Sequence, residues 1–334
     1  MVDPPRLAAV TGAEGFIGSH LVETLVSAGH RVRAMVLYNS FGSWGWLETL
    51  DPTMLRQVEI VLGDVRDPVS VADFVRGVDC VYHLAALIAI PYSYRAPASY
   101  LATNAGGTLN VLEAARQLGV RRVVHTSTSE VYGTARTVPI SEEHPLQGQS
   151  PYSASKIAAD ALAQSYHLSF GLPVVTLRPF NTFGPRQSAR AVIPTIITQI
   201  AAGRNEIKLG STAPTRDFTL VTDTARAFMA VGEASPEGVV GEVFNAGSGT
   251  ETSVANLVGL IAEEMGRSVS VVTEGERMRP DASEVMRLLS DSSKLRSATG
   301  WVPQVSLSDG LRRTIAWFRE PANLSRYKVD LFNV

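Results

Sequence analysis

Three glycines, each three residues apart, follow the first apolar run of the chain. Leu7–Thr11 is predicted to be a strand and Phe16–Ala28 a helix, and Gly12, Gly15 and Gly18 fall where one meets the other. Glycines there permit a tight turn, let the backbone approach a pyrophosphate and allow the helix to pack closely on the strand. The helix N-terminus would face the anion. The pattern therefore indicates a dinucleotide-binding loop rather than an ordinary turn.

Short β-branched runs alternate with helical stretches through the first half of the chain. We expect strands at Val32–Leu37, Val58–Leu62, Val78–Leu84, Arg122–Thr126 and Val174–Leu177, and helices at Pro68–Arg76, Ala98–Leu118 and Pro151–Phe170. Strands that alternate with helices and are apolar on both faces form a parallel sheet covered on both sides. The sequence predicts an α/β fold with a Rossmann-type, doubly wound parallel sheet.

After Pro179 this alternation loosens. Helices are expected at Val192–Ala202 and near Thr222–Gly232, with short strands between them. We therefore predict a dinucleotide-binding domain over residues 1–180. Residues 181–334 would form a smaller α/β substrate lobe that closes over the edge of the sheet, with elements partly interleaved between the two.

The composition excludes several classes of protein. Of 334 residues, 45% are hydrophobic and 19% charged, and the formal net charge is −2, so neither a disordered chain nor a nucleic-acid-binding protein is indicated. Cys80 is the only cysteine, which suits a reducing cytoplasm. We expect a cytoplasmic protein without a membrane segment. The six histidines show no metal-ligand spacing, so no metal is predicted.

A tyrosine and a lysine lie one helical turn apart, at Tyr152 and Lys156. Both can point from one helix face, and an ammonium group beside a phenol favours the phenolate, which can then take a proton from a sugar hydroxyl. Such a pair alone is common on helices. Here it follows a nucleotide loop, and Thr128 comes directly after a predicted strand. Together these residues resemble the Ser/Thr–Tyr–Lys triad of the extended short-chain dehydrogenases.

The resemblance extends nearly end to end and is strongest to the sugar-nucleotide epimerase/dehydratase branch. It is carried by Leu177–Gln187, Pro214–Asp223, Phe244–Gly249 and Arg279–Leu288. It implies a nucleotide-diphosphate sugar as substrate, with these contacts: Ile88, Asn181, Val192, Arg216 and Arg279. Two arginines and an amide suit a diphosphate, because charge-assisted and bidentate hydrogen bonds are strong.

The same resemblance implies NAD as cofactor. It predicts cofactor contacts from Gly12, Gly15, Phe16, Ile17, Gly18, Tyr38, Asn39, Ser40, Asp64, Val65, Leu84, Ala85, Ala86, Asn104, Tyr152, Lys156 and Pro179. The end of the second predicted strand, however, carries neither an acidic residue for the adenosine ribose nor an arginine for a 2′-phosphate. NADP therefore stays open.

The reaction is indicated by the segment Ser127–Gly133. Simple 4-epimerases of this family usually carry a small residue where Glu130 stands, whereas 4,6-dehydratases and uronate decarboxylases carry the glutamate. Oxidation at C4 acidifies the C5 hydrogen, which a carboxylate can remove while the C6 hydroxyl leaves as water. The resemblance thus predicts a 4,6-dehydratase with these catalytic residues: Thr128, Ser129, Glu130, Tyr152 and Lys156. Ser129 stands where many dehydratases have an Asp that protonates the departing hydroxyl. Either Ser129 replaces that acid, or Glu130 acts first as the base and then as the acid.

Three alternatives stay open. A uronate decarboxylase shares the Ser-Thr-Ser-Glu-Val-Tyr run, but Leu87–Tyr94 is an apolar loop that suits a neutral C6 group better than a carboxylate. A 4-epimerase is the second, and a protein that binds NAD(P) only to sense redox state is the third. Within the dehydratases, Tyr38–Trp46 and Ser283–Leu288 most resemble enzymes of the legionaminic acid pathway, which act on nucleotide-linked N-acetylglucosamine.

A homodimer is also expected. In this family the outer faces of two long helices, here Ala98–Leu118 and Pro151–Phe170, form a four-helix bundle with a second subunit. Leu109, Val111 and Leu112 suggest more apolar surface than one subunit can cover, as does Leu162.

Overall fold

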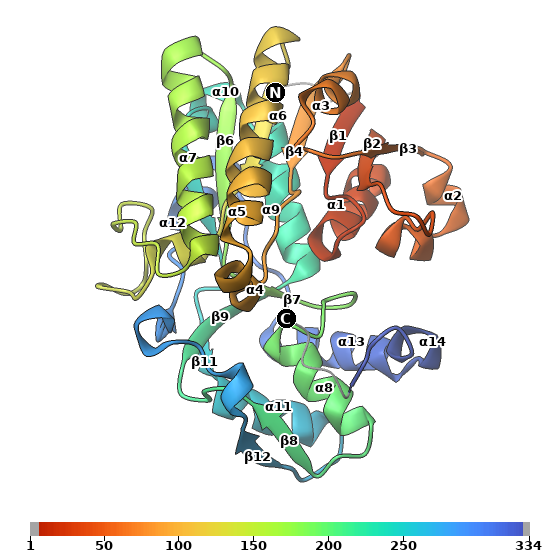
Figure 1. Cartoon of the computed structure of the whole chain (residues 1–334), viewed down its shortest axis with the longest axis vertical. Helices are drawn as coiled ribbons and strands as arrows, with labels where there is room; N and C mark the ends of the chain where they lie inside the picture. The colour runs from red at the N-terminus through yellow and green to blue at the C-terminus, as the bar shows by residue number, and fades with distance from the viewer. Residues whose placement is uncertain (1–6, 330–334) are drawn as a thin grey trace.

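A seven-stranded parallel sheet forms the centre of the computed structural model, which describes residues 7–329 (Figure 1). Its spatial order is β10 (Val243–Ala246), β6 (Val174–Pro179), β5 (Arg122–Thr126), β4 (Cys80–His83), β1 (Leu7–Thr11), β2 (Arg31–Leu37) and β3 (Val58–Gly63). Every neighbouring pair is parallel. The predicted Rossmann-type, doubly wound sheet is confirmed.

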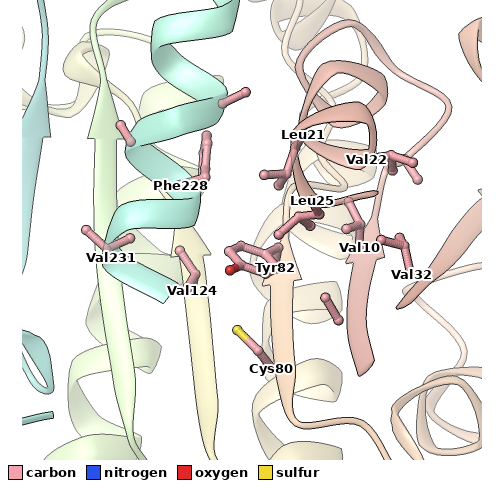
Figure 2. Packing of buried hydrophobic residues seen from close by; sticks show 14 of the residues in the cluster. Val10, Leu21, Val22, Leu25, Val32, Cys80, Tyr82, Val124, Phe228 and Val231 are labelled. Atoms are coloured by element: carbon pink, nitrogen blue, oxygen red, sulfur yellow. The ribbon is translucent and has the colours of Figure 1, made fainter. Parts of the chain in front are cut away.

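Helices cover both faces of this sheet. One face carries α1 (Phe16–Ser27) and α9 (Val221–Glu233), and the other carries α3 (Pro68–Val75), α6 (Gly107–Gln117) and α7 (Pro151–Phe170). Side chains alternate along each strand, so Tyr82 packs under α1 and α9 while Val81 packs on the opposite side. Figure 2 shows the apolar cluster between the sheet and helices α1 and α9, in which Leu21, Leu25 and Phe228 point toward the sheet around Tyr82.

The predicted helix 98–118 is present as an uninterrupted helical stretch from Pro97 to Gln117, with a π-helical turn inside it. The chain passes from α4 (Ile90–Arg95) through α5 (Pro97–Tyr100) and a π-helical turn, Leu101–Gly106, into α6. The apolar loop expected over Leu87–Tyr94 is thus partly helical. Val111 and Leu112 are fully buried within the subunit, so they contribute nothing to the outer apolar surface on which the expectation of a dimer drew.

A smaller lobe lies below the sheet in Figure 1. It contains β11 (Glu251–Ser253), β9 (Thr215–Leu220) and β13 (Arg287–Leu288) side by side, β7 (Asn181–Phe183) paired with β9, and β12 (Ser270–Thr273) paired with β8 (Glu206–Leu209). Its core joins α8 (Val192–Ala201), α11 (Val254–Glu264) and α13 (Leu307–Arg319). Other short helices lie in various parts of the molecule, not all of them in this lobe: α2 (Pro52–Leu55), α10 (Pro236–Val239), α12 (Ser293–Thr299) and α14 (Pro321–Leu324).

The two parts of the chain interleave, because β10 and α9 follow residue 180 yet belong to the first sheet and its helical layer. Within residues 7–329, none of the helices combines the length and apolar character that a bilayer span requires.

Candidate active site

A cavity of about 1330 Å³ lies where the carboxyl ends of the strands meet the smaller lobe. In open parallel sheets this edge is where ligands bind. Of the residues singled out by sequence, the following line it: Gly12, Gly15, Phe16, Ile17, Gly18, Asp64, Val65, Leu84, Ala85, Ala86, Ile88, Thr128, Ser129, Glu130, Tyr152, Lys156, Pro179, Asn181, Val192, Arg216 and Arg279. Side chains from both halves of the chain thus meet in one place.

The glycine-rich loop forms the floor of the cavity before α1. Gly12 has φ +66°, and a Cβ there would lie 2.9 Å from the backbone of Ala85. A Cβ on Gly18 would lie 2.1 Å from the carbonyl oxygen of Gly12. A side chain at Gly12 or Gly18 would therefore fill the space beside the loop or displace α1 from it. The bare backbone and the N-terminus of α1 fit a pyrophosphate.

The segment after β4 is fixed by a threonine. Thr11 Oγ1 accepts hydrogen bonds from the backbone N–H groups of Leu84 (3.0 Å) and Ala85 (3.1 Å). The same oxygen lies 2.8 Å from His83 Nδ1, and burial lowers the pKa of His83 well below its usual range. A neutral imidazole and a hydroxyl thus hold the backbone that lies along the cavity.

Four predicted cofactor residues lie outside the cavity lining. Tyr38 and Ser40 are exposed, and Asn39 uses its amide within its own loop, accepting from Ser43 N (3.1 Å) and donating to Ser43 O (2.8 Å). Asn104 is buried. Its amide bonds the backbone of Leu87, at 2.8 and 2.9 Å, and also donates to a serine hydroxyl. It positions the segment after β4, and direct cofactor contacts from these four stay predictions.

Tyr152 and Lys156 occupy the first turns of α7, which begins with a Ser150 capping box. Burial raises the pKa of the Tyr152 phenol, and a hydrogen bond with Thr128 opposes that shift. Lys156 Nζ donates to Thr126 O at 2.5 Å. Burial lowers the pKa of Lys156 to about 8. The tyrosine, threonine and lysine of the predicted triad therefore come together at one wall of the cavity.

A buried polar cluster supports this wall, and the sequence did not reveal it. Asp160, one turn beyond Lys156, accepts hydrogen bonds from Ser127 Oγ (2.7 Å) and Arg178 Nη2 (2.9 Å), and its other oxygen lies 3.0 Å from His125 Nε2. Burial alone would raise the pKa of Asp160. The hydrogen bond and charge of His125, with the charges of Arg178 and Lys156, lower it to about 2.

Glu130 sits in a 3₁₀ turn, Ser129–Tyr132, that Thr128 caps by accepting from Glu130 N at 3.2 Å. Its carboxylate lies 4.0 Å from Arg279 Nη1, which is also 3.7 Å from Glu284. Arg279 Nη1 is buried and makes no hydrogen bond within residues 7–329. The turn therefore aims a carboxylate into the cavity beside a cation that a ligand could engage.

The far wall supplies further polar groups. Arg216 Nη2 lies 3.4 Å from Glu284 Oε1, and burial lowers the pKa of Arg216. Asn181 Oδ1 is buried and has no hydrogen-bond partner in the described part of the chain. Glu284 was missed as a site residue, although it falls within Arg279–Leu288, one of the segments that carry the resemblance. Such unpaired buried groups suit a polar ligand.

Six more arginines line the cavity: Arg66, Arg95, Arg186, Arg190, Arg277 and Arg326. Arg186 is held bidentately by Glu23 at 2.8 and 3.0 Å, and Arg66 pairs with Asp64. Arg95, Arg190 and Arg326 belong to no motif, so only tertiary structure reveals them. Across residues 7–329, no cluster of His, Cys, Asp and Glu could hold a metal ion.

Comparisons with known proteins match this chain to proteins named as nucleotide-sugar dehydratases and epimerases. Residues 9–314 match the family described as GDP-mannose 4,6 dehydratase. A UDP-glucose 4-epimerase of Mycolicibacterium smegmatis is 35% identical, with 93% of this chain and 97% of that protein covered. A dTDP-glucose 4,6-dehydratase of an Actinoplanes species is 33% identical at the same coverage. The structure of DesIV, a dTDP-glucose 4,6-dehydratase from Streptomyces venezuelae with NAD bound, has a TM-score of 0.85 and 32% identity, covering 96% of this chain and 99% of that one.

Proposed function

The chain belongs to the GDP-mannose 4,6-dehydratase family, and from this premise we propose that it converts a nucleotide-linked hexose or N-acetylhexosamine into the 4-keto-6-deoxy sugar. It is an enzyme of the short-chain dehydrogenase/reductase superfamily, whose relatives act on nucleotide sugars. The observation that carries the finer assignment is Glu130, a carboxylate that lines the same cavity as Tyr152 and Lys156.

The cofactor of this reaction is NAD, as in the solved DesIV structure. The loop from Gly12 to Gly18 would hold its pyrophosphate, because a Cβ at either end would collide with backbone. When bound, NAD supplies a hydride acceptor for C4 and the hydride that C6 receives at the end.

Tyr152 acts as the base toward the C4 hydroxyl. Its phenol is buried, so ionisation depends on nearby groups that stabilise the phenolate. Lys156 supplies a positive charge, because its pKa of about 8 keeps the ammonium form at neutral pH. A hydrogen bond with Thr128 lowers the pKa of the tyrosine and so favours the phenolate. Together they would take the hydroxyl proton during oxidation at C4.

Glu130 then removes the C5 proton. Ser129, which stands where many dehydratases have an acid, is buried in the same turn and lines the cavity, but a serine hydroxyl is too weak an acid to protonate a departing hydroxide. Glu130 gains a proton from C5, and that proton can pass to the C6 oxygen as water leaves. One carboxylate would thus serve as base and then as acid.

The nucleotide diphosphate would bind on the opposite wall. Arg216 and Arg279 carry charge, and the amide of Asn181 can donate hydrogen bonds through its Nδ2 group. Arginine binds phosphate oxygens bidentately, so these groups suit the diphosphate that every nucleotide sugar shares. They do not discriminate among bases. The resemblance of Tyr38–Trp46 to legionaminic-pathway enzymes supports an N-acetylglucosamine nucleotide as the first substrate to test.

A 4-epimerase is the second candidate, because the Mycolicibacterium relative bears that name. An epimerase needs only the tyrosine, the lysine and the cofactor, and it has no task for Glu130. A uronate decarboxylase would place a sugar carboxylate in a cavity that already holds Glu130 and Glu284. Like charges close together repel, which supports a neutral C6 group instead.

The decisive experiment incubates the purified enzyme with NAD and a panel of nucleotide hexoses, and follows the loss of one water by mass spectrometry. Glu130→Gln should lower the rate of water loss on the order of 10²–10⁴-fold. Glu143→Gln, which alters an exposed glutamate outside the cavity, is the matched control. An isomerised sugar that keeps its C6 hydroxyl would support the epimerase, and release of carbon dioxide from a uronate the decarboxylase. No change in any sugar would indicate a sensing role.

We also infer a cytoplasmic homodimer that pairs the outer faces of α6 and α7. Exposed apolar side chains on this side support it: Leu101, Leu109, Leu168 and Phe170, of which Leu168 is 74% exposed. Large apolar side chains in contact with water favour association with a partner surface.

A further inference from the structure

A carboxylate lies at the end of strand β2, although the residues that end this strand include no Asp or Glu. Glu14 lies inside the glycine-rich loop and lines the cavity. Its Oε1 accepts a hydrogen bond of 3.0 Å from the backbone N–H of Leu37, the last residue of β2. In dinucleotide-binding folds an acidic residue near this point binds the adenosine ribose. Leu37–Ser40 contains none, yet Glu14 brings a carboxylate to the end of the same strand.

The second carboxylate oxygen is unused. Glu14 Oε2 is buried and has no hydrogen-bond partner in the described chain. Burial raises the pKa of Glu14, and the hydrogen bond from Leu37 opposes that shift. A buried acceptor without a donor is costly, so such an atom in a cavity wall points to a donor supplied by a ligand.

Neighbouring residues fix Glu14 in place. Trp46 N donates to Glu14 O at 3.0 Å, and a Cβ at Gly45, which has φ +57°, would lie only 2.7 Å from that oxygen. Leu37 and Trp46 also line the cavity and present apolar surface beside the carboxylate. The site is therefore built from the glycine loop, the end of β2 and the segment after it.

We propose that Glu14 accepts a hydrogen bond from the adenosine ribose of the cofactor and thereby selects NAD over NADP. The inference rests on the proposed use of a nicotinamide dinucleotide. A ribose 2′-hydroxyl can donate to the unused oxygen, whereas a 2′-phosphate would bring negative charge against the carboxylate. A hydrogen bond to a charged group changes affinity by about 10- to 100-fold, which sets the expected preference for NAD.

A nearby cation, Arg326, would instead favour NADP. Arg326 lines the cavity and stacks on Trp46, with its guanidinium carbon 5.5 Å from the ring centre. It could pair with a 2′-phosphate. Glu14 is favoured because it is hydrogen-bonded to the end of β2, whereas the Arg326 guanidinium, among residues 7–329, is placed by its contact with the tryptophan ring alone.

Titration calorimetry of the full chain with NAD and with NADP, without sugar, tests the proposal. We expect NAD to bind at least about 10-fold more tightly. Glu14→Gln should weaken NAD binding and strengthen NADP binding, so that the preference falls about 10-fold or more. Glu48→Gln is the matched control: its carboxylate accepts from Trp44 N at 2.6 Å in the adjoining segment but does not line the cavity.

Equal or tighter binding of NADP by the unaltered protein would overturn the proposal, whether or not the variants fold. Loss of NADP binding in Arg326→Gln would then assign the selection to that arginine. An unchanged preference in folded Glu14→Gln would also refute it. Failure of the dehydratase assignment is seen separately, because water loss from the sugar does not enter these affinities.

Discussion

Replacing Asp160 by Asn tests whether charge holds the buried cluster that supports the cavity wall carrying Tyr152 and Lys156. Asp160 faces Arg178 and Lys156, and it also accepts from Ser127 and contacts His125. Asn keeps the size of the side chain but removes the negative charge. The guanidinium and the ammonium then stay buried without their counter-ion, which is the costly way to break an ion pair.

The magnitude follows from the pKa and from the geometry. A carboxyl whose pKa falls from 3.8 to about 2 on folding contributes about 2 kcal/mol at neutral pH. Removal of one partner of a buried pair costs about 3–5 kcal/mol, because the other charge is left behind. We therefore expect Asp160→Asn to lower the free energy of unfolding by about 2–5 kcal/mol at pH 7. Since the folded pKa is depressed, this contribution exists above about pH 4 and disappears as the pH falls toward 2.

Urea unfolding at pH 7 and near pH 3 measures both parts of this prediction. The matched control is Asp73→Asn, which removes a carboxylate from an exposed ion pair with Arg76 and should change stability by less than about 1 kcal/mol. The difference between Asp160→Asn and the unaltered protein should shrink at the lower pH. A loss below about 1 kcal/mol at pH 7, or an equal loss at both pH values, would refute the electrostatic account.

Three further predictions follow from the site. Burial lowers the pKa of Lys156 to about 8, and Asp160 opposes this shift. The rate of water loss should therefore fall as the pH rises through about 8, and in Asp160→Asn the same fall should occur at lower pH. A pH–rate profile that is flat to pH 10 would contradict this. Gly18→Ala should abolish cofactor binding, measured by calorimetry, because the added Cβ would lie 2.1 Å from Gly12 O. Light scattering should give twice the mass of one chain, and Leu168→Glu, on the exposed face of α7, should give a monomer.

Local signals in the sequence predicted the elements that build the site. The glycine loop, the alternation of strands and helices, and the Tyr152–Lys156 pair depend on residues close in sequence, and each lies where it was expected. Residues at the ends of parallel strands share one edge of a sheet, so Thr128 and Glu130 could also be placed there.

Properties that depend on packing could not be predicted in this way. Val111 and Leu112 looked like excess apolar surface, but α6 turns them into the core against α3 and the sheet. Asn104 is predicted to contact the cofactor, and only the structure shows that its amide holds the backbone after β4. Glu14 lies inside the recognised motif, yet only the hydrogen bond to Leu37 shows that it reaches the end of β2.

Three arginines of the cavity, Arg186, Arg216 and Arg279, differ in the geometry of their ion pairs. Arg186 is held by Glu23 at 2.8 and 3.0 Å, a bidentate pair that spans the glycine-loop helix and the smaller lobe, so it is committed to the fold. Arg216 and Arg279 lie 3.4 to 4.0 Å from carboxylates, at or beyond the outer limit of a hydrogen bond. In the proposed function, a diphosphate would engage these two cations at closer range and with little loss of existing bonds. All three arginines lie in segments that carry the family resemblance, and the tightness of each ion pair is what distinguishes Arg186 from the two arginines proposed to bind the substrate.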